Sequence, residues 1–155
     1  MAFKLSSRSL SRLDGVHPDM VAVVKRAIEL TKVDFGVTEG TRSVATQREY
    51  VAAGKSQTMN SKHLPQSDGY SHAVDVVAYV GGNVSWELNL YDDIADAFKQ
   101  AAKELDVSIK WGAAWNVSDI TKWGGTMEDA MMHYIDERRS QGRRPFIDGP
   151  HFELI

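Results

Sequence analysis

The residues best suited to chemistry lie in the stretch SKHLPQSDGYSHAVD, from Ser61 to Asp75. It contains two histidines, His63 and His72, and two aspartates, Asp68 and Asp75. Imidazole nitrogens and carboxylate oxygens are ligands through which proteins hold divalent metal ions. Because the chain has no cysteine, a metal site would have to be built from these residue types. The stretch therefore raises the question of which side chains bind a metal and for what purpose.

Asp75 is the one charged residue in the apolar run AVDVVAYV, Ala73 to Val80. This run predicts a strand that ends at the following Gly-Gly-Asn. An unpaired carboxylate in a buried strand is unfavourable, so we expect a metal ion, an arginine or backbone amides to compensate Asp75. An aspartate that is simply hydrogen-bonded near the strand's start is the alternative.

The end of the chain, DGPHFELI, presents a second carboxylate and imidazole together. The Gly-Pro pair predicts a turn between Asp148 and His151, and PHFELI predicts a closing strand. Since alternate residues of a strand face the same side, His151 and Glu153 would face away from the core that Phe152 enters. A half-buried strand without a chemical role is the alternative.

A histidine and an aspartate from one segment, with a histidine from a distant strand, would provide three nitrogen and oxygen ligands. Three protein ligands and one water molecule are the pattern of catalytic zinc. Zinc lowers the pKa of this water, which becomes a nucleophile at neutral pH. The water also needs a carboxylate that accepts and delivers protons, and Asp148 is well placed for this role.

These motifs resemble those of the phage L-alanyl-D-glutamate endopeptidases, which are endolysins of the VanY-type zinc peptidase family in the LAS group. The family pattern is S-x-H-x-x-G-x-A-x-D, followed far downstream by an acidic residue, two positions and a metal-binding His. The matching segments are Ser61-Lys62-His63, Ala73-Val74-Asp75 and Asp148-Gly149-Pro150-His151. The opening helix, the EGTRS turn, the SQTMNSKH loop and the KWGAAW segment also look like their counterparts, so the resemblance covers nearly the whole chain.

The resemblance implies three zinc ligands, His63, Asp75 and His151. It implies that Asp148 is the general acid and base. It also implies that Arg42 lies in the groove, where a guanidinium suits a substrate carboxylate or a developing oxyanion. Gln47 is expected to support Arg42 in binding substrate. A surface ion pair is the alternative for Arg42.

The sequence departs from the family pattern between His63 and Asp75, where the spacer is about five residues longer. His72 is therefore a competing ligand. We prefer His63 because it keeps the Ser-x-His context, and because His72 and Asp75 would face opposite sides of an extended strand. The inserted PQSDG has the composition of a turn, in which Asp68 is expected to be a turn residue.

The interspersed helices and strands favour an α+β fold with a small, mostly antiparallel sheet flanked by helices, as in the LAS-type zinc peptidase fold. The turns are unlike those of regular βαβ units. We expect helices at 18–32, 44–53, 91–105 and 127–139, and strands at 34–40, 73–80, 107–111 and 150–155.

At 155 residues, the chain is expected to form a single catalytic domain, 1–155, with no separate wall-binding domain. It has no run of eighteen apolar residues and no signal-peptide pattern at its start. We therefore expect it to stay in the host cytoplasm until a holin releases it to the periplasm and cell wall.

The net charge of −3 gives no general attraction to nucleic acid, so no nucleic-acid partner is expected. The basic segment RRSQGRR, Arg138 to Arg144, is compatible with contact to an outer membrane. A solvated helix end is the alternative for this segment.

Together these observations predict a zinc-dependent peptidoglycan hydrolase, acting as a monomer, that cleaves the L-alanyl-D-glutamate bond of the stem peptide during host lysis. A D,D- or L,D-carboxypeptidase with the same metal site is one alternative. A non-catalytic, zinc-stabilised peptidoglycan-binding module is another.

Overall fold

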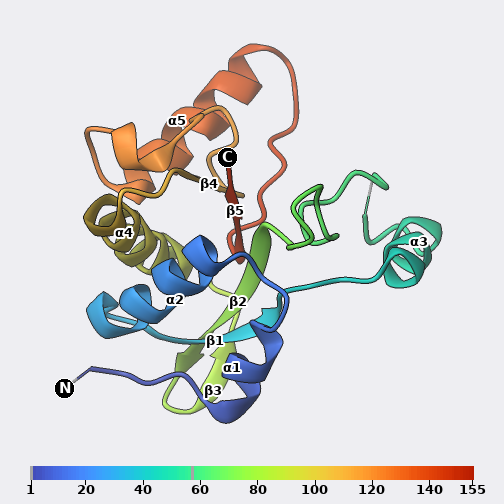
Figure 1. Cartoon of the computed structure of the whole chain (residues 1–155). Helices are drawn as coiled ribbons and strands as arrows, with labels where there is room; N and C mark the ends of the chain where they lie inside the picture. Colours follow the sequence, from blue (N-terminus) through green and yellow to red (C-terminus); the bar gives the residue numbers. More distant parts are fainter. Residues whose placement is uncertain (1, 57) are drawn as a thin grey trace.

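A five-stranded sheet forms the centre of the computed structural model, which describes residues 2–56 and 58–155 (Figure 1). The strand order is β1-β2-β5-β4, β3 also pairs with β2, and all four strand pairings are antiparallel. The predicted α+β class is thus confirmed. The strands are β1 (Asp34–Glu39), β2 (Ala73–Val80), β3 (Asn83–Ser85), β4 (Ile109–Trp111) and β5 (His151–Leu154).

The helices contribute most of the apolar surface that covers this sheet. They are α1 (Ser7–Arg12), α2 (Pro18–Leu30), α3 (Val44–Ala52), α4 (Leu88–Leu105) and α5 (Met127–Ser140), with a 3₁₀ helix, η1, at Ile120–Lys122. Helices α2 and α4 bury one apolar face each, and Phe98 of α4 stacks on Phe152 of β5 with 3.9 Å between ring centroids. Burying such side chains is the main source of stability. Among the described residues, no helix is both long and apolar enough for a membrane span.

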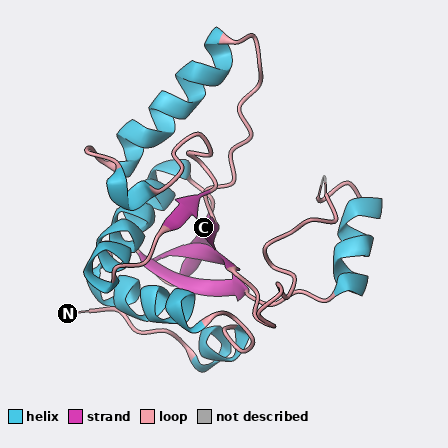
Figure 2. Ribbon diagram, turned by 45° about the horizontal axis from the view of Figure 1, so that its top comes forward, coloured by secondary structure: helices cyan, strands magenta, loops and turns pink. Residues whose placement is uncertain are grey.

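Helix α3 stands apart from the other helices (Figures 1 and 2). Gln47 is the only residue of α3 that is buried, so this helix lacks the apolar face that holds α2 and α4 to the sheet. Ser43 is the N-cap, and its hydroxyl accepts a hydrogen bond from the amide of Thr46. The segment from α3 to the start of β2 forms an arm beside the sheet.

Three local features differ from the sequence predictions. Helix α4 begins at Leu88, three residues earlier than expected, because its N-cap Glu87 makes no side-chain capping bond that would mark the start. Helix α1 was not predicted, and neither was β3. Gly81 and Gly82 both have positive φ (58° and 82°), which suits a tight hairpin. The chain therefore turns back after β2 and forms β3, which pairs with β2.

Candidate metal centre

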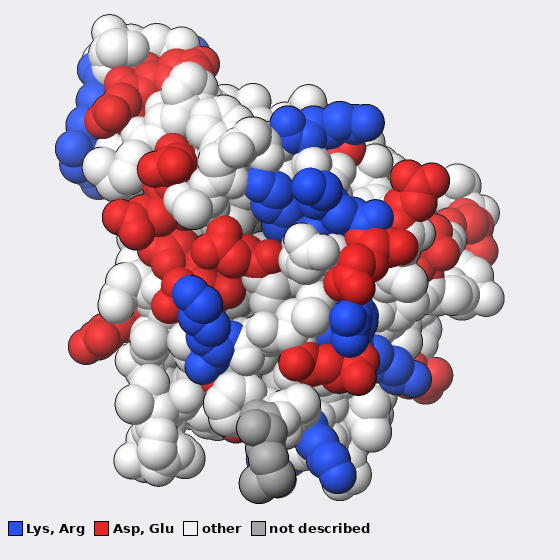
Figure 3. All heavy atoms as spheres, turned by 90° about the vertical axis from the view of Figure 1, so that its left-hand side faces the viewer, with Lys and Arg blue, Asp and Glu red and all other residues white. Residues whose placement is uncertain are grey.

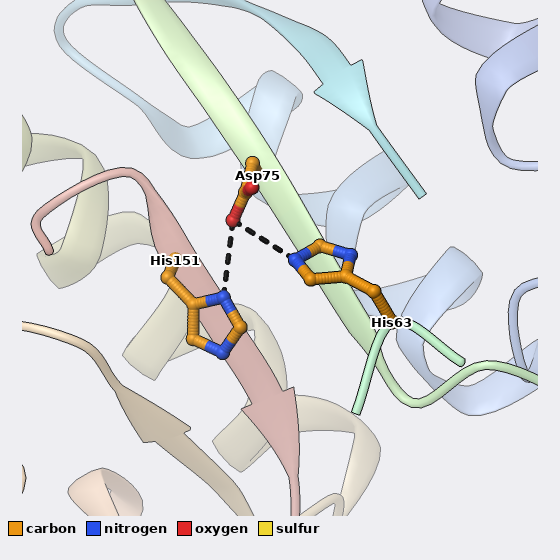
Figure 4. A group of neighbouring side chains, drawn as sticks. All are labelled: His63, Asp75 and His151. Carbon is orange, nitrogen blue, oxygen red and sulfur yellow. Dashed lines mark hydrogen bonds and ion pairs between the residues drawn. The ribbon is translucent and has the colours of Figure 1, made fainter. Parts of the chain in front are cut away.

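Three side chains from separate parts of the chain converge at one end of the sheet (Figure 4). Asp75 of β2 and His151 of β5 are cross-strand partners, and His63 comes from the loop that precedes β2. Asp75 Oδ1 lies 3.0 Å from His151 Nδ1 and 3.2 Å from His63 Nε2. One ligand atom from each residue lies within 4.8 Å of the others. These are the three side chains expected to bind a metal.

The ring of His63 is oriented by the backbone. Its Nδ1 lies 2.8 Å from the carbonyl oxygen of Gly40, and since a carbonyl can only accept, Nδ1 carries the proton. Nε2 is therefore the nitrogen with a lone pair, and it points toward Asp75 (Figure 4). This Nε2 is buried and has no hydrogen-bond partner within the described chain. A metal ion would satisfy it.

His151 is oriented by a carboxylate. Its Nε2 donates a hydrogen bond to Glu153 Oε1 at 2.8 Å, which leaves Nδ1 directed at Asp75. A metal-binding histidine commonly has such a partner, which fixes the ring and increases its basicity. The sequence assigned no role to Glu153, although its position two residues after His151 in a strand already placed both side chains on one face.

The donor set fits a metal ion. Two imidazole nitrogens and one carboxylate, each held by the chain, leave room for a further ligand, as in catalytic rather than structural zinc sites. The orphaned nitrogen of His63 fits the same interpretation, because buried polar atoms rarely lack a partner.

Burial of Asp75 is compensated by positive charge, as the sequence required. Burial alone would raise the pKa of this carboxyl, but the rings of His151 and His63 beside it outweigh burial and hold the pKa well below its usual range. Burial alone would lower the pKa of His151. Hydrogen bonds to Asp75 and Glu153 outweigh burial and raise the pKa of the imidazole. Arg42 adds a further charge, with Nη2 4.0 Å from Asp75 Oδ2.

Asp148 occupies the turn before β5 and lines the same groove. Its amide donates to the carbonyl of Gly112 at 2.8 Å, and its own carbonyl accepts from the amide of His151. A Cβ at position 112 would lie 2.2 Å from the Asp148 carbonyl oxygen, so only glycine permits this contact. Burial, and then the charge of Asp75, raise the pKa of the Asp148 carboxyl, which suits a group that must gain and lose a proton.

Arg42 is buried and is held by two side chains. It donates to Glu39 and, through Nη1 at 2.7 Å, to Gln47 Oε1. Gln47 is fully buried, and its amide nitrogen donates to Ser56 and to the carbonyl of Thr58. The structure thus brings Gln47 to Arg42 as expected, but places it behind the guanidinium rather than at the groove surface.

A groove of about 640 Å³ runs over the metal ligands and Asp148. One wall is aromatic, with Trp115 stacked on Phe146 at 6.4 Å and tilted over His151 at 5.5 Å. The arm forms the other wall, where the Arg42 guanidinium carbon lies 4.6 Å from the centroid of the Tyr50 ring. The sequence assigned no role to these aromatic residues, because aromatic side chains more often pack in a core or a loop than line a groove.

His72 lies apart from the three candidate metal ligands. Its Nε2 lies 2.8 Å from Asp68 Oδ2, in the inserted loop. Asp68 also accepts the amide of Tyr70, as expected of a turn residue. The insertion therefore forms a turn of its own and leaves His63 beside Asp75.

Comparisons with known proteins agree with this geometry. The family model of the phage L-alanyl-D-glutamate peptidases matches residues 1–155. The L-alanyl-D-glutamate peptidase of Escherichia phage T5 is 32% identical over 159 residues, with all of both chains covered. The crystal structure of the Serratia marcescens L-Ala D-Glu endopeptidase ChiX superposes with a TM-score of 0.71 at 38% identity, covering 98% of this chain and 90% of that one. This chain therefore belongs to the phage L-alanyl-D-glutamate peptidase family.

Proposed function

We propose that this protein is a zinc-dependent endopeptidase that cleaves the L-alanyl-D-glutamate bond of the peptidoglycan stem peptide. The observation that carries the proposal is the convergence of three metal-ligand side chains and a carboxyl of raised pKa in one groove. Membership in the family and the activities named for its relatives support the choice of bond.

His63, Asp75 and His151 would hold the zinc ion. When bound, zinc would polarise the scissile carbonyl and lower the pKa of a water molecule in the groove. Asp148 would accept the proton of the attacking water and deliver it to the leaving amine nitrogen. Its raised pKa supports this double role, because an efficient acid and base has a pKa nearer the working pH than an ordinary aspartate.

Arg42 would bind the negative charge that develops on the scissile carbonyl oxygen, or a carboxylate of the substrate. A buried, preorganised donor stabilises such charge without reorganising during the reaction. Its bonds to Glu39 and Gln47 support this role, since they hold the guanidinium in one orientation beside Asp75. Gln47 would assist substrate binding through Arg42.

The biological role would be host-cell lysis by a bacteriophage. We propose that the enzyme is a monomer that remains in the host cytoplasm until a holin lets it reach the cell wall. Its match along the whole length of the phage T5 peptidase supports a lytic role for a single catalytic domain. Outer-membrane contact through Arg138 to Arg144 remains a secondary proposal, supported by the exposure of most of this segment.

The test is mass spectrometry of purified peptidoglycan after digestion by the wild-type protein, by chelator-treated protein, and by the same protein after zinc is restored. We expect stem-peptide fragments that begin with D-glutamate, lost on chelation and recovered with zinc. Free D-alanine as the sole product would identify a carboxypeptidase instead. An intact substrate with folded, zinc-loaded protein would identify a binding module.

A further inference from the structure

Three cationic side chains, Arg42, Lys55 and Lys62, line the groove, and they differ in the contacts that they make with the rest of the chain. Arg42 is buried and already donates to two side chains. Lys55 is exposed on the arm and lies 5.7 Å from the centroid of the Tyr50 ring. Lys62 is half-buried, and within the described chain its ammonium makes no hydrogen bond or ion pair. Lys62 therefore has a charge available for a ligand.

The backbone places Lys62 beside the reacting centre. It directly precedes the metal ligand His63, and its carbonyl accepts the amide of His72 at 2.8 Å, which fixes the segment next to the start of β2. Its charge also reaches Glu153. Burial alone would raise the pKa of the Glu153 carboxyl. The hydrogen bond to His151, and then the charges of Lys110 and Lys62, outweigh burial and lower that pKa.

Three of the four carboxylates that line the groove are already engaged by other groups. Glu39 accepts from Arg42, Asp75 pairs with the two histidines, and Glu153 accepts from His151. An ammonium group that lines a groove and lacks an internal partner suits an anionic group of the substrate.

The bond proposed for this enzyme brings such an anion to the site. In a glutamate residue that continues through its side-chain carboxyl, the carbon attached to the scissile nitrogen carries a free α-carboxylate. This carboxylate is two bonds from the nitrogen that leaves, so it must lie close to the metal ligands when the bond is cleaved.

We propose that Lys62 binds the α-carboxylate of the glutamate that follows the scissile bond, and so makes the enzyme prefer this acid to its amide. The inference rests on the proposed function and names a specificity residue for the same site. An ammonium pairs strongly with a carboxylate, whereas a neutral carboxamide offers it only an ordinary hydrogen bond.

The test compares two synthetic muropeptides that differ only at this group, one with a free α-carboxylate and one with an α-carboxamide. Values of kcat/KM are measured for wild type, Lys62→Met, Lys62→Arg and Lys110→Met. Lys110 is a matched control, because its charge also acts on Glu153 while it does not line the groove. Zinc content and circular dichroism are recorded for every sample.

We expect Lys62→Met to lower kcat/KM about tenfold for the acid and less than about twofold for the amide, as for loss of a partly exposed charge-assisted pair. Lys62→Arg should keep most of the preference for the acid, and Lys110→Met should keep all of it. An equal loss on both substrates, or the same change in Lys110→Met, would overturn the role of Lys62 alone. A wild-type protein that cleaved neither substrate would overturn the proposed function and this role with it.

Discussion

At the scale of single residues, each histidine of the candidate metal centre is oriented by a partner behind its ring. Gly40 orients His63 through its carbonyl oxygen, and Glu153 orients His151 through its carboxylate. The sequence motif predicted the three side chains of this centre because the residue types and their order suit a metal ion. It could not identify Gly40, because a backbone carbonyl can come from any residue and its position depends on the fold.

The role of Asp148 is tested by Asp148→Asn, which keeps the shape of the side chain but removes the proton acceptor. We expect kcat to fall about 10²–10⁴-fold, the usual contribution of a general acid and base, with zinc content unchanged. Steady-state kinetics and metal analysis on the same sample measure both. Activity near the wild-type level would show that another group moves the proton.

Glu153→Gln tests the orienting bond to His151. The amide accepts a hydrogen bond but lacks the negative charge, so we expect zinc affinity to fall about 10–100-fold, as for loss of other partners of metal ligands. Competition with a chromogenic chelator measures the affinity. Asp68→Asn is the control, because Asp68 pairs with His72 outside the centre, and it should bind zinc as wild type does.

At the scale of elements, the pairing of β2 with β5 brings Asp75 opposite His151. The strand that carries Asp75 was predicted with its observed bounds, since AVDVVAYV is a long apolar run between turn residues. The pairing itself could not be predicted, because it joins residues 76 positions apart and depends on packing of the whole sheet. The resemblance to a family supplied Asp75 and His151 as expected ligands, but not the pairing of their strands.

Helix α4 contains a carboxyl whose environment opposes its charge. Burial, and then the charges of Asp93, Glu128 and Asp96, raise the pKa of Asp92 from its ordinary 3.8 to about 6. Figure 3 shows acidic side chains gathered on the face that includes α4 and α5. As the pH rises from about 4 to about 6, Asp92 gives up its proton in the unfolded chain but keeps it in the folded protein. The folded protein therefore becomes less stable over this interval, and its stability stays lower at higher pH.

We therefore expect Asp92→Asn to raise the free energy of unfolding by about 1–3 kcal/mol at pH 7.5, since one pKa unit corresponds to about 1.4 kcal/mol. At pH 3.5 the gain should be close to zero. Urea unfolding at the two pH values measures the difference. An equal increase in the free energy of unfolding at pH 7.5 and at pH 3.5 would mean that packing, rather than charge, is responsible. Asp93→Asn provides a comparison on the same helix.

At the scale of the whole molecule, the groove lies between a well-packed body and an arm that has little apolar packing of its own. The buried amide of Gln47 bonds to Arg42 on one side and to Ser56 and Thr58 on the other. This side chain therefore links Arg42 to the loop that follows α3. The family resemblance led us to expect that Gln47 supports Arg42. The bonds to Ser56 and Thr58 were not predicted, because α3 lacks an apolar stripe that would mark its buried face.

Gln47→Ala should loosen the arm and release Arg42. We expect faster amide hydrogen exchange in residues 43–60 and about a tenfold lower kcat/KM, as for loss of buried hydrogen bonds to a charged group, with little change in the exchange of β2 and β5. Thr46→Ala is a control on the same helix. Unchanged exchange in the arm would show that other contacts hold it.

The central claim is that His63, and not His72, completes the metal centre with Asp75 and His151. The most direct measurement is the number of zinc ions bound per chain, by mass spectrometry of the folded protein, for wild type, His63→Ala and His72→Ala. We predict one tightly bound zinc ion per chain in wild type and in His72→Ala, and none in His63→Ala. Zinc lost from His72→Ala and kept by His63→Ala would contradict this claim.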